Sequence, residues 1–198
     1  MHDEPDRSPA RRRDARENRE RILAAAREVF ASAGFEAPLD AIARRAGVGR
    51  ATLYRNFPDR FALAAAICED NLATLEALAR ALRGRPGAFM TLLSAIVEQQ
   101  IEGHALVPAL LTGPSAPDLA ALAGRVTRLL AGPLRRARAD GAVRADLTAS
   151  DVLAVLAMVS AVVAGKASVR ERRARAMRAL ALVVDGLVPR IDRVARSS

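Results

Sequence analysis

The chain has 198 residues, a length that favours one ordinary domain or a small domain joined to a larger one. Hydrophobic residues make up 51% and charged residues 27%, which is typical of a globular protein with a substantial core. Aromatic residues make up only 3%, which argues against a surface that stacks single-stranded nucleic acid. The formal net charge of +9 suits an anionic partner, either a nucleic acid or a membrane surface.

Few side chains in this sequence could perform catalysis or bind a metal. Cys68 is the only cysteine, and the only histidines are His2 and His104. The sequence therefore has neither an internal disulfide nor a multi-cysteine zinc site, and it has no paired carboxylate constellation. We expect no metal, no cofactor and no enzymatic activity.

The polar N-terminus predicts no secretory signal. The longest apolar run, over residues 152–165, is shorter than the roughly twenty residues that cross a bilayer. It predicts a buried helix rather than a membrane span. We expect a cytoplasmic protein with no membrane partner.

Residues 1–15 combine prolines, a run of three arginines and several acids, a composition typical of a disordered arm. The arm could contact DNA or serve only as a solubilising tail. Apolar residues then recur on one face from Ile22 to Phe30, which predicts a helix over residues 16–33 that ends at Gly34.

Residues 38–57 have the pattern of a helix-turn-helix. Pro38 suits the first position of one helix, and Gly47 ends it. A short helix follows from Gly49 to Phe57, because the next residue is a proline.

Downstream, a long helix is predicted over residues 59–82, followed by a break rich in glycine and proline. Further helices are predicted near residues 87–102, 105–111, 117–139, 148–165 and 170–188. Strand signals are absent, so we predict an all-α fold with about nine helices. It comprises a helix-turn-helix domain over residues 16–60 and a larger helical bundle over residues 61–198.

The short helix from Gly49 to Phe57 has two different faces. With about 100° per residue, Gly49 and Phe57 lie within about 40° of Leu53 and form the inner face. Small Ala51 and Arg55, which can pair with guanine, lie opposite. Three further polar residues flank the outer face or begin the helix: Arg50, Thr52 and Tyr54. The alternative is that these arginines are solvated charges on a surface helix.

Residues 43–60, with the sequence ARRAGVGRATLYRNFPDR, closely resemble the signature of TetR-family transcriptional regulators. The resemblance covers roughly residues 16–65. It implies that the segment from Arg50 to Asn56 lies in the major groove and that Tyr54 and Arg60 touch phosphates. Thr52 is implied to contact the DNA backbone or a base.

Three positions depart from the family pattern. Pro38 stands where Thr or Ser is frequent, which puts a cap and a phosphate contact in doubt. Gly49 replaces a frequent Ser, which weakens the N-cap of the reading helix. Asn56 stands where His is common and still offers a hydrogen bond.

The resemblance also implies a homodimer that pairs through the last two long helices. We expect its interface to use apolar residues of those helices, namely Val152, Leu156, Val159, Val163, Leu180, Val184 and Leu187. Two-fold pairing would match a palindromic DNA site. The alternative is one large core with no dimer.

The family usually holds a small-molecule pocket in the larger half. The candidate lining residues here are Phe89, Met90, Gln100, His104 and Met158. Each could instead be an ordinary core or surface residue. Few charges lie within the predicted apolar stripes, which favours an apolar or neutral effector.

The leading hypothesis is a sequence-specific regulator that binds double-stranded DNA, most simply a repressor released from its operator by an unidentified small-molecule effector. The alternative is a helical bundle that acts as a peripheral membrane or protein-interaction module. Binding to anionic vesicles as strong as binding to its own upstream DNA would favour the alternative.

Overall fold

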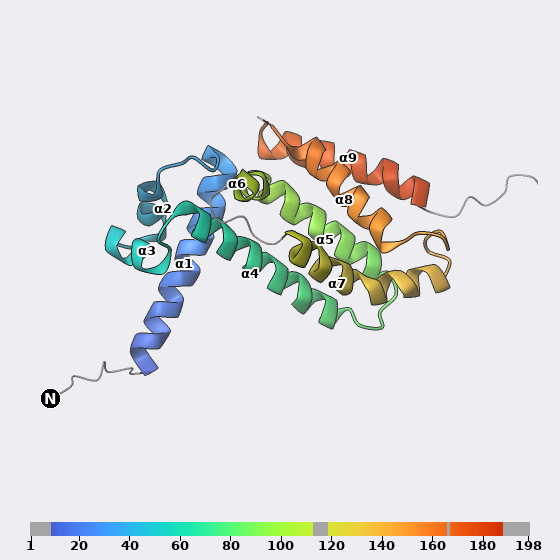
Figure 1. Ribbon diagram of the computed structural model, residues 1–198, viewed down its shortest axis with the longest axis horizontal. Coiled ribbons are helices and arrows are strands. Elements are labelled where there is room, and N and C mark those ends of the chain that lie inside the picture. Colours follow the sequence, from blue (N-terminus) through green and yellow to red (C-terminus); the bar gives the residue numbers. More distant parts are fainter. Residues whose placement is uncertain (1–8, 113–118, 166, 188–198) are drawn as a thin grey trace, which may run out of the picture. The chain divides into compact units, whose positions relative to one another are not determined.

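Nine α-helices and no strand form the part of the chain that the computed structural model describes, residues 9–112, 119–165 and 167–187 (Figure 1). The predicted all-α class and helix number are confirmed. The chain divides into two compact units. The described part of the first is residues 9–69 and 105–112, and that of the second is residues 70–104, 119–165 and 167–187.

The first unit contains α1 (Pro9–Ala33), α2 (Leu39–Ala46), α3 (Arg50–Asn56), the first part of α4 (Arg60–Ala81) and α6 (Leu106–Thr112). All five helices contribute buried apolar side chains to one core, including Ile22, Ile42, Leu53, Ile67 and Leu110. Helix α3 is only seven residues long, too short to be stable alone, so its position depends on this core.

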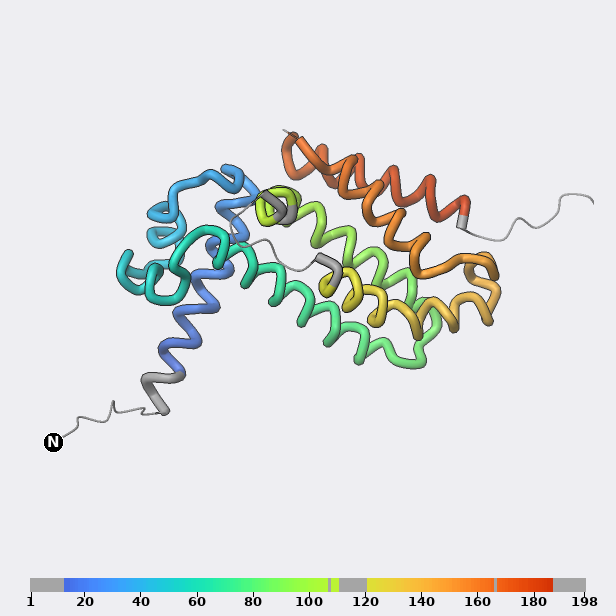
Figure 2. Tube along the Cα trace, in the orientation of Figure 1, coloured from blue at the N-terminus to red at the C-terminus, as the bar shows by residue number. Residues whose placement is uncertain are grey.

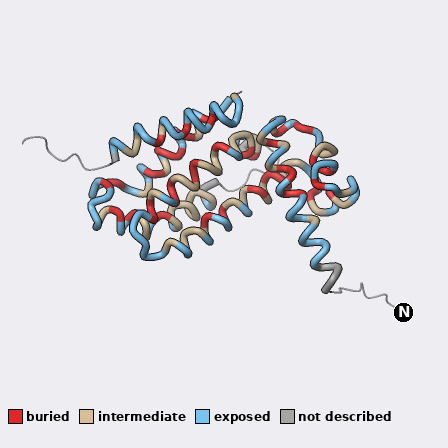
Figure 3. The backbone as a smooth tube through the Cα atoms, turned by 180° about the vertical axis from the view of Figure 1, so that it is seen from behind, coloured by how far each residue is buried: buried red, intermediate tan, exposed pale blue. Residues whose placement is uncertain are grey.

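The second unit contains the rest of α4, α5 (Ala88–Glu102), α7 (Leu119–Ala139), α8 (Ala149–Val163) and α9 (Val169–Leu187). Its core joins these helices through side chains that include Leu75, Leu92, Leu130, Val152 and Leu180. Figure 2 shows α8 and α9 side by side in opposite directions, and the two helices are in contact. In Figure 3, buried positions on α9 recur among exposed ones, as expected for a helix with one covered face.

Helix α8 is strongly apolar and begins with a capping box. The side chain of Thr148 accepts a hydrogen bond from the Asp151 backbone N–H, and the Asp151 carboxylate accepts one from the Thr148 backbone N–H. The cap explains why the helix begins at Ala149, close to the predicted start. No described helix is long and apolar enough to cross a membrane.

The turn between α2 and α3 depends on Gly47. This residue adopts a left-handed conformation with φ +63°, and the C-terminal carbonyls of Ala43 and Arg44 accept hydrogen bonds at the cap. Glycine adopts this conformation without the strain that a Cβ would introduce. The prediction that Gly47 ends the helix is confirmed, and the turn leads directly into α3.

The structure differs from the sequence predictions at three places. Helix α1 begins at Pro9, so the second half of the expected disordered arm is helical, and residues 1–8 lie outside the described residues. Two ion pairs at i,i+4 spacing, Arg13–Glu17 and Arg16–Glu20, support this extra length. Pro38 is the residue before α2, not its first helical residue. The first unit extends past residue 60 and includes α6.

Candidate nucleic-acid interface

Helix α3 is fixed by its inner face. Leu53 is 1% exposed and Phe57, directly after the helix, is also buried. The guanidinium carbon of Arg19 lies 4.9 Å from the centre of the Phe57 ring, and α3 packs against both α1 and α2. Gly49, which we expected on the inner face, is instead an exposed N-cap residue. The inner face therefore consists of Leu53 and Phe57.

The opposite face of α3 is exposed and carries no acid. Arg50, Ala51, Tyr54 and Arg55 are all exposed, and the seven residues of the helix include no aspartate or glutamate. Tyr54 is 48% exposed, although it is the only aromatic residue of the helix. An exposed aromatic ring among cations on a rigid helix is a surface suited to a polyanion rather than to a protein core.

Two polar side chains of α3 bond within the helix. The amide of Asn56 donates to the Thr52 carbonyl at 2.8 Å, and Arg55 donates to the Thr52 hydroxyl at 3.1 Å. Both Thr52 and Asn56 are half-buried. These bonds restrain the side chain of Arg55 on the outer face and that of Asn56 at the edge of the buried face.

The two cations at the edges of this surface have carboxylate partners. Arg50 pairs with Asp40 of α2. Arg60 pairs with Glu36, donates to the Phe35 carbonyl at 3.3 Å and stacks over the Phe35 ring. Exposed ion pairs contribute little stability, so a phosphate can replace either carboxylate at small cost.

One cation of this region was missed in the sequence. Arg44 is exposed in the last turn of α2, just before the turn that leads to α3. A basic residue at this position also balances the negative end of the α2 dipole. The presence of an arginine there therefore did not by itself indicate a contact with DNA.

The second unit contains a polar cluster of buried Arg172 with half-buried Gln100 and His104. Arg172 is 4% exposed and donates to the His104 Nε2 atom at 3.0 Å and to the Ala167 carbonyl at 2.9 Å. Gln100 donates to the Leu156 carbonyl at 3.1 Å. The Gln100 Oε1 and His104 Nδ1 atoms are buried without a hydrogen-bond partner among the described residues. Unsatisfied buried atoms of this kind are costly and point to a ligand or a water.

The cluster disfavours the charged form of His104. Burial lowers the pKa of His104, the Arg172 cation lowers it further, and the Ile101 carbonyl opposes these two effects. Because Arg172 donates to Nε2, the proton of the neutral ring lies on Nδ1. His104 therefore offers one buried donor, and Gln100 offers one buried acceptor.

Arg172 was not predicted as a site residue. It lies one turn before Ala176 and two turns before Leu180, which are both buried. Its position on the same face of the helix was the signal in the sequence that could have predicted its burial.

The other expected effector contacts do not join this cluster. Phe89 is fully buried in the core of the second unit, and Met90 is half-buried against that core. Met158 is 54% exposed, so it does not line the same interior. The helical periodicity of α8 did not show which of its faces is buried. Contacts with α5 and α9 determine that face.

The expected interface residues also need correction. Most of them lie inside the core of their own unit and present no surface to a partner: Val152, Leu156, Val159, Val163 and Leu180. Val184 is half-buried against that core, and the side chain of Leu187 lies outside the described residues. The exposed large apolar residues in the described parts of α8 and α9 are different ones, namely Met158, Val162, Val169, Met177 and Leu182.

The only cysteine of the sequence, Cys68, has an unreactive thiol. Burial and the neighbouring Glu69 raise the pKa of its thiol to about 11, although Arg27 opposes the shift. The thiol is protonated at neutral pH and is a poor nucleophile.

Two family models match the chain. The one described as bacterial regulatory proteins, tetR family, matches residues 22–67, which contain α2 and α3. The one described as transcriptional regulator SbtR-like, C-terminal domain, matches residues 85–189. No curated protein matches the chain.

Solved structures extend the similarity. A TetR transcriptional regulator from Streptomyces coelicolor is 32% identical with a TM-score of 0.63, over 87% of this chain and 99% of that chain. CprB from Streptomyces coelicolor, in complex with its biological operator sequence, is 26% identical with a TM-score of 0.60, over 88% and 90%. A gamma-butyrolactone receptor described as ArpA-like is 28% identical with a TM-score of 0.59, over 90% and 92%. Because the second family model spans more than half of the chain and the first regulator is 32% identical over nearly its whole length, the chain belongs to the TetR family of bacterial transcriptional regulators.

Proposed function

We propose that two copies of this chain bind a palindromic DNA operator through α3 and repress transcription in the cytoplasm until a small-molecule effector releases them. The observation that carries the proposal is the exposed, acid-free face of α3, held by a buried inner face. The CprB structure, solved with its operator, supports the same use of this fold.

The contacts follow from the chemistry of the α3 surface. Arg55 reads a guanine, and Ala51 allows the helix to approach the base edges closely. Tyr54 and Arg50 bind phosphates from the exposed face, and Thr52 adds a backbone or base contact. Asn56 contributes through its amide oxygen, since its amide nitrogen donates within the helix. Arg60 exchanges Glu36 for a phosphate.

The effector binds at Gln100 and His104 in the second unit. The Nδ1 donor of His104 and the Oε1 acceptor of Gln100 both lack partners among the described residues, so a ligand with both an acceptor and a donor satisfies them together. A neutral molecule that carries a carbonyl and a hydroxyl group has this chemistry. The similarity to a gamma-butyrolactone receptor supports a ligand-binding role for this half.

The test uses fluorescently labelled DNA from upstream of the protein's own gene. We expect Tyr54→Ala to weaken binding at least about tenfold, because each bound dimer loses two phosphate contacts. The affinity of the wild type should also fall steeply with salt. Arg170→Gln, a change at an exposed residue of α9, is the control and should bind as the wild type does.

Circular dichroism and gel filtration would show that the Tyr54 variant keeps its helices and its assembly. Wild-type affinity in a folded Tyr54→Ala protein would refute the contact assignment. Equal affinity for anionic lipid vesicles and for the upstream DNA would instead favour a peripheral membrane module.

A further inference from the structure

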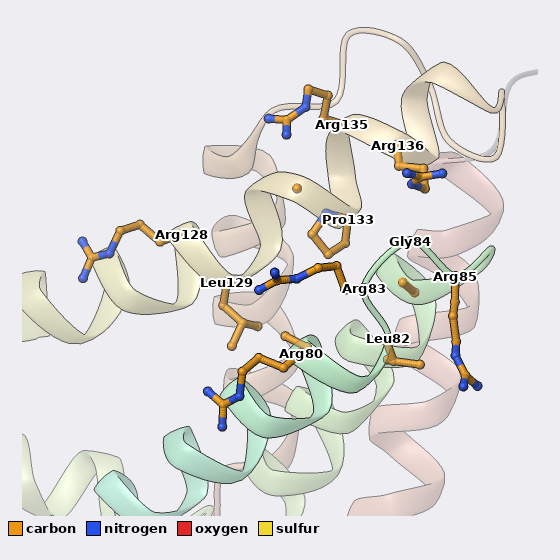
Figure 4. Close-up of a pocket in the computed structure, with 13 residues that line it drawn as sticks. Arg80, Leu82, Arg83, Gly84, Arg85, Arg128, Leu129, Pro133, Arg135 and Arg136 are labelled. Carbon is orange, nitrogen blue, oxygen red and sulfur yellow. The ribbon is translucent and has the colours of Figure 1, made fainter.

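A cavity of about 340 Å³ lies in the second unit, between the end of α4, the loop that follows it and α7 (Figure 4). It lies apart in sequence from Gln100 and His104, and neither of them lines it. Its walls carry six arginines, namely Arg80, Arg83, Arg85, Arg128, Arg135 and Arg136. No aspartate or glutamate is among the described residues that line it. The volume is enough for a small ligand.

Three of these residues, Arg80, Arg83 and Arg128, form what we name the tri-arginine cluster. In Figure 4 their guanidinium groups extend in the same direction, whereas Arg85 points away from them. All three also line an adjoining cavity of about 460 Å³, so the cluster lies where the two cavities meet. The only acid that lines the second cavity, Glu76, is bonded to Arg125 at 3.0 Å.

The cluster lacks the partners that other arginines of this unit have. Arg125, Arg144 and Arg173 each form an ion pair with a carboxylate. Within the described ranges, no hydrogen bond or ion pair joins the side chain of a residue of the tri-arginine cluster to another group. All three side chains are exposed, so solvent screens part of their mutual repulsion, and a bound anion would remove more of it.

The ends of helices explain only part of this arrangement. Arg80 lies in the last turn of α4, where a cation balances the helix dipole. Arg128 lies in the middle of α7, where no such effect operates. Arg83 lies beyond the end of α4, in a turn closed by a hydrogen bond from its own N–H to the Arg80 carbonyl. The fold therefore brings Arg80, Arg83 and Arg128 to one cavity from two helices and a loop.

Gly132 of α7 also lines the cavity. A Cβ atom at Gly132 would meet nothing within 4 Å, and its backbone is helical, so the glycine is not needed for a turn. We propose that this cavity binds the phosphate groups of a small, multiply phosphorylated compound, with the tri-arginine cluster as its anchor. Guanidinium forks match phosphate oxygens in geometry and charge.

The experiment titrates the full-length protein with sodium pyrophosphate in a calorimeter at constant ionic strength. We expect saturable binding of one pyrophosphate per chain. Arg80→Gln/Arg83→Gln and, separately, Arg128→Gln should each weaken it at least tenfold. The matched control, Arg170→Gln/Arg175→Gln, removes two exposed charges of α9 and should stay within twofold of the wild type. Absence of wild-type binding, or equal weakening by the control, would overturn the proposal.

A second variant tests the cavity without changing its charge. Gly132→Leu should fold, since leucine favours a helix, and should place a bulky side chain at a position that lines the cavity. We expect it to weaken pyrophosphate binding at least tenfold, and unchanged binding in this variant would overturn the proposal. Thermal melts of all variants would show that they are folded.

Titrations with other phosphate compounds identify the source of the phosphates. A nucleoside triphosphate that binds at least tenfold more tightly than inorganic triphosphate identifies a nucleotide, and equal affinity identifies an inorganic polyphosphate. Either result supports the site. If the cluster variants bind pyrophosphate normally and lose affinity only for nonspecific duplex DNA, the cluster is a nucleic-acid surface and the proposal fails.

Discussion

At the scale of single residues, arginine has three different roles in this protein. It supplies 30 of the 31 basic residues, since Lys166 is the only lysine, so its frequency alone carries little information. Arg50 and Arg60 are held by exchangeable carboxylates beside the α3 surface. Arg172 is buried and fixes the tautomer of His104. The tri-arginine cluster lines a cavity that has no aspartate or glutamate among its described lining residues.

The burial of His104 predicts a pH dependence of stability. Its pKa is lowered in the folded protein from the ordinary value of 6.5, because burial and Arg172 disfavour the imidazolium. Its contribution to stability is therefore complete above pH 6.5 and is lost as the pH falls through the lower, folded-state pKa. We expect the urea midpoint of the wild type to fall between about pH 7 and pH 5 more than that of His104→Gln.

The chain offers a matched control for this measurement, because His2 is the only other histidine. His2→Gln should show the same pH profile as the wild type. If His104→Gln and the wild type lose stability in parallel, the imidazole does not titrate differently on folding and its assigned neutral state is wrong.

At the scale of helices, sequence periodicity predicted most of the fold. Helix α3 was located to within one residue because Gly47 and Pro58 end the segments on either side, and its buried residues follow the helical period. The start of α1 was missed because the charged residues before residue 16 have no apolar stripe. They are held instead by side-chain ion pairs, which composition does not distinguish from a solvated arm.

The buried face of α8 could not be predicted for a related reason. A helix that is apolar on nearly all sides has no single face that periodicity can assign to the core. The structure buries Val152 and Val159 and exposes Met158 and Val162. The same limit applies to the effector site, where the pairing of His104 with Arg172 joins residues far apart in the sequence.

Replacement of Gly47 tests the turn that positions α3. Gly47→Ala places a Cβ in the left-handed conformation and should destabilise the protein by about 1 kcal/mol. We expect a lower melting temperature together with weaker operator binding, since the turn sets the position of the reading helix. The comparison is informative because a Cβ at Gly47 meets no atom within 4 Å, so strain and not a clash is the cause.

Gly49→Ser is the control for that prediction. Gly49 also has open space around it, but its backbone is extended with φ −70°, which serine adopts readily. Serine is a good N-cap residue, so this variant should melt at or above the wild-type temperature. A Gly47→Ala protein as stable as Gly49→Ser would contradict the importance of the turn.

At the scale of the whole molecule, the two units divide the proposed function between them. The first holds the α3 surface, and the second holds Gln100, His104 and the exposed apolar residues of α8 and α9. Helix α4 contributes residues to both units and connects them covalently. An effector can release DNA only to the extent that it prefers the non-binding state, and a hundredfold preference corresponds to about 2.7 kcal/mol.

The exposed apolar residues predict where two copies meet. Leu182 is 56% exposed on α9, and Met177 on the same helix and Val162 on α8 are also exposed large apolar residues. We expect Leu182→Glu to convert a dimer into a monomer, as measured by light scattering after gel filtration. Operator affinity should fall at least about a hundredfold, because a monomer contacts only one half-site. Ala142→Glu adds the same charge at an exposed position between α7 and α8 and should remain a dimer. A Leu182→Glu protein that still elutes as a dimer and still binds the operator would exclude α9 from the interface, because a buried unpaired carboxylate at a two-fold contact would be too costly to tolerate.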